Sequence, residues 1–190
     1  MRRMVAIVIF VTAVPVAAQT DVRLTDAGAT ELHWAAHRDD LALADRLIRG
    51  GAKVDAANEY GVTPLVLACT NRSTAMVEKF LAAGANPNAA QTNGVTPLME
   101  CARTGAAAAA AALLSRGASV NAAHAKSWQT ALMWAAAGMH ADVVKLLIDR
   151  AAAVRARSTG GFTPLLFAAG SGDEASARLL LDARADVNDA

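Results

Sequence analysis

The side chains best suited to chemistry in this sequence are four histidines and two cysteines. His33 and His37 are four residues apart, a spacing that on a helix lets two imidazoles approach one metal ion, but no glutamate completes an H-E-x-x-H motif. His124 and His140 lie in separate segments without a partner at ligand spacing. We therefore expect no metal site and no other cofactor.

The two cysteines, Cys69 and Cys101, leave two interpretations open. They are either small buried side chains or a disulfide formed in an oxidising compartment, which requires their Cα atoms to lie within about 7 Å. A redox-active pair is not predicted, because the chain has no C-x-x-C motif.

Signatures of catalysis are also missing from the sequence. It contains no serine nucleophile elbow, phosphate-binding loop or dinucleotide fingerprint. The acidic pairs Asp39-Asp40 and Asp173-Glu174 fall where helices are expected to begin, and a carboxylate is favourable there without any catalytic role. We therefore predict that the protein is not an enzyme.

The composition indicates closely packed helices rather than one large core. Of the 190 residues 54% are hydrophobic, but only 4% are aromatic and 48 are alanine. Alanine favours helix and lets neighbouring helices approach closely. The formal net charge of +1 argues against a nucleic-acid-binding protein, for which a basic domain is expected.

These helices must be organised by a repeat, because one pattern recurs five times. A threonine is followed two residues later by leucine, then by a pair of small residues, by aliphatic residues, and by a turn of small residues. The threonines stand 33, 33, 34 and 33 residues apart, at Thr30, Thr63, Thr96, Thr130 and Thr163.

This pattern resembles the ankyrin repeat, with its period of about 33 residues and its T-P-L-H-x-A signature. The resemblance implies an all-α solenoid of stacked helix-turn-helix units with projecting hairpin-like loops, over residues 26–58, 59–91, 92–124, 125–158 and 159–190. We expect each threonine to cap an inner helix and proline to occupy its first turn. His33, in the signature's histidine position, is expected to make structural hydrogen bonds between loops.

Three positions depart from the repeat. Trp128 stands where the other repeats have Gly28, Gly61, Gly94 and Gly161. Ala151 and Arg184 replace the glycine that ends the outer helix, at a cost of about 1 kcal/mol each if the left-handed conformation is kept.

The N-terminus has the layout of a secretory signal peptide. Arg2 and Arg3 precede an apolar run over residues 4–14, and small residues lead to a predicted cut after Ala18. The run is too short to span a bilayer, which needs about 20 residues. We expect residues 1–18 to be removed, residues 19–25 to form a short linker, and the protein to be secreted or periplasmic, with no membrane association after cleavage.

The resemblance also implies where a partner binds, because ankyrin repeats usually hold partners with loop tips and the exposed face of the inner helices. Carried over by position, the candidate partner-binding residues are Trp34, His37, Arg38, Tyr60, Asn93, Arg103, Trp128, Trp134 and Phe162. All three tryptophans and the only tyrosine fall in this set, and Trp, Tyr and Arg dominate interface energetics. The alternative is that Trp34, Trp134 and Phe167, which share one repeat position, stack as part of the core.

These observations favour an exported, non-enzymatic scaffold that binds another protein through a concave groove and loop tips, and that is itself a monomer. The alternative function is an accessory or inhibitory subunit of an exported enzyme.

Overall fold

The computed structural model of the chain describes residues 28–188. The predicted signal peptide and linker, residues 1–25, lie outside these. Within residues 28–188 there are ten helices and no strand, and the only β pairing is an isolated antiparallel bridge between Ala123 and Thr130. None of these helices is long and apolar enough to cross a membrane.

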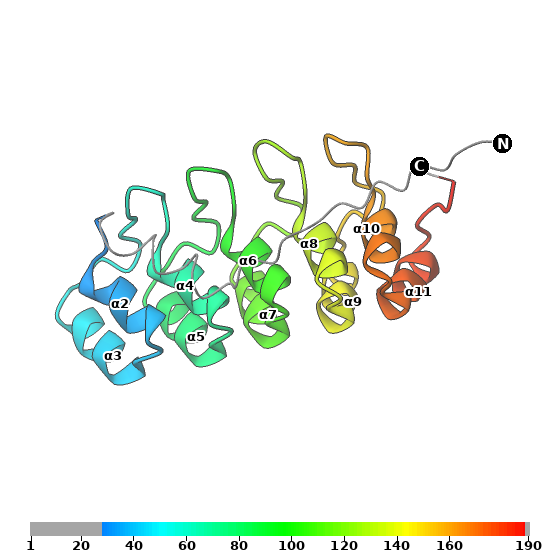
Figure 1. Cartoon of the computed structure of the whole chain (residues 1–190). Helices are drawn as coiled ribbons and strands as arrows, with labels where there is room; N and C mark the ends of the chain where they lie inside the picture. Colours follow the sequence, from blue (N-terminus) through cyan, green and yellow to red (C-terminus); the bar gives the residue numbers. More distant parts are fainter. Residues whose placement is uncertain (1–27, 189–190) are drawn as a thin grey trace.

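The helices form five antiparallel pairs that stand side by side in one row (Figure 1). The inner helices, on the side of the projecting loops, are α2 (Glu31–His37), α4 (Pro64–Thr70), α6 (Pro97–Thr104), α8 (Ala131–Ala137) and α10 (Pro164–Ser171). The outer helices are α3 (Leu41–Arg49), α5 (Thr74–Ala82), α7 (Ala107–Ser115), α9 (Ala141–Asp149) and α11 (Glu174–Asp182). The all-α repeat solenoid expected from the sequence is confirmed.

The inner helices begin as expected in three of the repeats. The side chains of Thr63, Thr96 and Thr163 each accept a hydrogen bond from the backbone N–H three residues on, and proline follows each threonine. The prediction is wrong for Thr130, whose side chain makes no capping hydrogen bond. Ala131 replaces proline there, so that α8 starts without either device.

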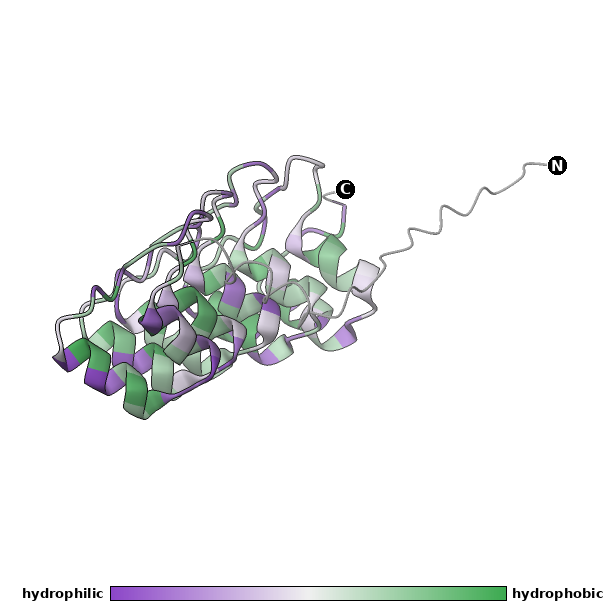
Figure 2. Cartoon of the chain, turned by 60° about the vertical axis from the view of Figure 1, so that its left-hand side comes forward, coloured by the Kyte–Doolittle hydropathy of each residue, from purple (hydrophilic) through white to green (hydrophobic). Residues whose placement is uncertain are grey.

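The core lies between the inner and outer helices and between neighbouring repeats. Ala35 and Ala68, members of the small-residue pairs, are fully buried, which lets consecutive inner helices pack closely. Phe80 and Leu113 on the outer helices are also fully buried. Figure 2 shows the hydrophobic residues concentrated in the row of helices. Because each helix pair buries its apolar side against the next, stability is shared between neighbours.

The positions that depart from the repeat keep its backbone conformation. Ala151 and Arg184 have φ angles of 62° and 67°, in the left-handed region. Trp128 also lies in this region, with a φ angle of 56°. At the equivalent position of other repeats, Gly61 and Gly94 have φ angles of 72° and 88°. A bulky residue is strained in this region, so the loop before α8 carries a tryptophan at an energetic cost.

Candidate protein-binding surface

The loops present three large aromatic side chains to solvent. Tyr60 is 47% exposed, Trp128 64% and Phe162 54%. Backbone hydrogen bonds join adjacent loops and fix their spacing, from Thr92 N–H to the Tyr60 carbonyl (3.0 Å) and from Thr159 N–H to the Ser127 carbonyl (2.9 Å). Each of these aromatic side chains therefore stands on a loop that is hydrogen-bonded to a neighbouring loop.

A second group of candidate residues lies at the C-terminal part of α2 and the residue after it. The Arg38 guanidinium carbon is 5.7 Å from the centroid of the Trp34 ring, and the His37 ring meets the same tryptophan edge-on at 6.1 Å. Arg38 is exposed, whereas Trp34 is half-buried. The structure thus brings these three predicted residues together at the first repeat.

An apolar pocket of about 290 Å³ opens among the third, fourth and fifth repeats. Its lining includes Arg103 from α6, Gln129 from the preceding loop, Met133, Trp134 and Ala137 from α8, and Phe167 from α10. The Trp134 indole N–H donates to Gln129 Oε1 (3.1 Å), which fixes the orientation of the ring in the wall. Phe162 lies beside this site, with its ring centroid 6.1 Å from that of Phe167.

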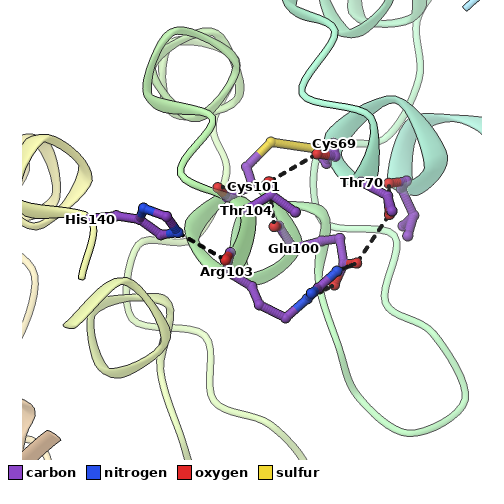
Figure 3. A network of polar contacts seen from close by, with 8 residues as sticks. Cys69, Thr70, Glu100, Cys101, Arg103, Thr104 and His140 are labelled. Atoms are coloured by element: carbon purple, nitrogen blue, oxygen red, sulfur yellow. Dashed lines mark hydrogen bonds and ion pairs between the residues drawn. A yellow bond between two sulfur atoms is a disulfide. The ribbon is translucent and has the colours of Figure 1, made fainter. Parts of the chain in front are cut away.

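Arg103 at this pocket is already paired within its own helix. Its guanidinium donates to Glu100 from Nη2 (2.6 Å) and from Nε (3.3 Å), and Thr70 on α4 donates to the same carboxylate (3.0 Å; Figure 3). The hydrogen bond to Glu100 raises the pKa of Arg103 further above its ordinary value, against the opposing effect of burial. On the far side, His140 Nε2 donates to the Arg103 carbonyl (3.1 Å), which ties α6 to the start of α9.

The cysteines meet directly behind this network. The structure joins Cys69 of α4 and Cys101 of α6 in a disulfide, with Cα atoms 4.7 Å apart and both residues fully buried (Figure 3). The Thr104 hydroxyl lies 3.0 Å from the Cys69 carbonyl, as a second link between the same two helices. The relative placement of the second and third repeats is thus held by both covalent and polar contacts.

His33 has the structural role that the resemblance implied. Its Nε2 donates to the Val62 carbonyl (2.9 Å) and its Nδ1 accepts from the Thr30 backbone N–H (3.1 Å), so it links the first loop to the second. Burial lowers the pKa of His33, and the hydrogen bond to Val62 opposes this only in part. The neutral imidazole is therefore the form that the fold holds.

The other predicted positions are spread along the surface. Asn93 is half-buried, and its Oδ1 accepts from the Val95 N–H, so it also serves the turn of its own loop. Trp34, Trp134 and Phe167 are half-buried and pack against the core with one side. Packing against the core agrees with the alternative interpretation of these rings, and Trp134 and Phe167 also line the pocket. Contact of any of these residues with a partner stays a prediction.

Two features of the site were not predicted from the sequence. Met133 forms part of the pocket although it is fully buried, because the pocket reaches between helices. The pairing of Glu100 with Arg103 was detectable, because residues three apart face each other on a helix. Among the described residues, no group of three or more His, Cys, Asp or Glu side chains is placed to hold a metal ion.

Comparison with protein families gives a match to the model for ankyrin repeats, described as three copies, over residues 32–124 and 119–190. A search of curated proteins found no match.

Proposed function

Since the chain belongs to the ankyrin-repeat family, whose repeats generally mediate protein–protein interaction, we propose that it is an exported, monomeric, non-enzymatic scaffold. It holds another protein against the inner helices and loop tips. No membrane association follows once residues 1–18 are removed, and the compartment is the periplasm or the medium.

The main support for this binding site is the exposed and strained position of Trp128. Its side chain is 64% exposed, and its backbone is in a conformation that glycine adopts in the equivalent loops. Neither exposure nor strain stabilises the fold, so a contribution outside the folded chain is the physical reason to keep tryptophan there. Exposed Tyr60 and Phe162 extend the same edge.

Export is supported by the layout of the N-terminus and by the buried pair of Cys69 and Cys101. A disulfide persists in an oxidising compartment and is rare in a reducing cytosol. Cell fractionation followed by intact-mass measurement tests this proposal. A protein cleaved after Ala18 in the exported fraction supports it, and a full-length protein confined to the cytosol contradicts it.

Affinity capture from the exported fraction tests the binding role. We expect wild type to co-purify a protein that the folded double variant Tyr60→Ala/Trp128→Ala captures much less. Val187→Ala is the matched control, because Val187 is also exposed (67%) but lies in the turn after α11. Equal capture by wild type, the double variant and the control, all folded, would show that Tyr60 and Trp128 are not part of the binding site.

A further inference from the structure

The pocket at Trp134 has the size of a side-chain site. At about 290 Å³ it lies at the lower limit of cavities that enclose a whole small molecule. Met133, Trp134 and Phe167 provide apolar walls, and Ala137, an exposed residue at the end of α8, borders it. Such a site matches one aliphatic or aromatic side chain of a larger partner.

The charge at this pocket is already balanced. The Arg103 guanidinium is held by the Glu100 carboxylate, whose side chain is only 12% exposed. A ligand carboxylate would have to displace a partly buried ion pair that Thr70 also stabilises. The pocket itself therefore selects for an uncharged, apolar group.

The two segments that lead into α8 and α10 have a single sign of charge. Residues 116–130 and 150–163 contain no aspartate or glutamate, and their cations are Arg116, Lys126, Arg150, Arg155 and Arg157. By contrast, the corresponding segment 50–63 carries Lys53, Asp55 and Glu59. Lys126 and Arg157 are exposed and lie close in sequence to Trp128 and Phe162. This asymmetry favours an acidic partner surface and disfavours a basic one.

Resting on the proposed protein-binding function, we propose that the Trp134 pocket receives an apolar side chain from an acidic segment of the partner protein. The apolar side chain supplies the anchor, and acidic residues beside it face the basic loops before α8 and α10. The loops steer the encounter, whereas burial of the anchor determines the residence time.

Selection from a displayed library of random peptides tests this proposal, with the purified protein as bait. We expect enriched peptides to combine an apolar residue with neighbouring Asp or Glu. Synthetic peptides of the enriched sequence should bind on the order of tenfold more weakly to Ala137→Gln, which places a longer side chain over the pocket. Ala175→Gln, at an exposed position of α11, is the matched control and should bind as wild type does.

The contribution of charge is tested with Lys126→Glu/Arg157→Glu, which should weaken peptide binding and reduce the dependence of binding on salt.

Enrichment of basic peptides, equal binding by wild type and Ala137→Gln, or no enrichment at all would overturn the proposal. Displacement of the peptide by a single-stranded oligonucleotide would assign the site to nucleic acid instead. Peptide binding that is lost with Tyr60→Ala/Trp128→Ala but unaffected by Ala137→Gln would leave the protein-binding function intact and refute only the pocket.

Discussion

At the scale of the single residue, His33 shows how the fold selects a protonation state. One ring nitrogen donates to the Val62 carbonyl and the other accepts from the Thr30 N–H. A second proton on the ring would break the hydrogen bond from the Thr30 N–H, in a site where burial already disfavours charge.

We expect the chain to lose stability in mild acid through this residue. Because the pKa of His33 is lowered in the folded state, the unfolded chain binds the proton first as the pH falls. The contribution of neutral His33 to the free energy of unfolding is therefore fully present above the unfolded-state pKa of about 6.5 and is lost as the pH drops below it. Urea unfolding between about pH 7.5 and about pH 5.5 measures this fall. The fall in the free energy of unfolding with pH should be smaller in His33→Gln. An equal fall in this variant and in wild type would exclude His33 as the cause.

The turn after α9 provides a second test on one residue. Ala151 has a φ angle of 62°, which glycine adopts without strain. Ala151→Gly should therefore raise the free energy of unfolding by about 1 kcal/mol, measured by urea denaturation. Ala153→Gly, at an exposed neighbouring position outside the left-handed region, should give no such gain.

At the scale of the element, Cys69 and Cys101 join two consecutive inner helices. They are separated by 32 residues of chain, and closing a loop of that length reduces the entropy of the unfolded state. Both residues stand where the other repeats have alanine, so the bond is added to a packing arrangement that works without it.

Replacing the pair tests this contribution. Cys69→Ala/Cys101→Ala should lower the free energy of unfolding by about 3–4 kcal/mol under non-reducing conditions and make stability independent of reductant. Thiol labelling of the denatured, unreduced wild type should find no free thiol. Complete labelling of both cysteines would show that the bond does not form.

The helix pairs were predictable from the sequence because their signals recur at every repeat. Thr63 and its equivalents mark the starts of the inner helices. The wrong prediction of a cap at Thr130 does not change the prediction of the helix, because α8 still forms after it. The pocket was less predictable because it combines side chains from three repeats, and its shape depends on how closely α6, α8 and α10 pack. The individual surface positions Trp134 and Arg103 followed from the repeat, but the neutralising contact with Glu100 was not inferred.

At the scale of the whole molecule, stability should vary along the row. Met99 on α6 is fully buried between neighbouring repeats, whereas Leu166, its counterpart on α10, is only half-buried. Met99→Ala should therefore lower the free energy of unfolding by about 2–5 kcal/mol, and Leu166→Ala by roughly half as much. Chemical denaturation of both variants compares them, and equal losses would contradict a stack stabilised by nearest neighbours.

We infer that the loop before α8 keeps Trp128 for contact with a partner and not for the stability of the fold. Trp128→Gly tests it most directly, because it removes the side chain and relieves the left-handed backbone in one change. We expect two opposite effects: the free energy of unfolding should rise by about 1 kcal/mol, and capture of the partner from the exported fraction should become markedly weaker. A variant that binds as wild type does, or that loses stability, would contradict it.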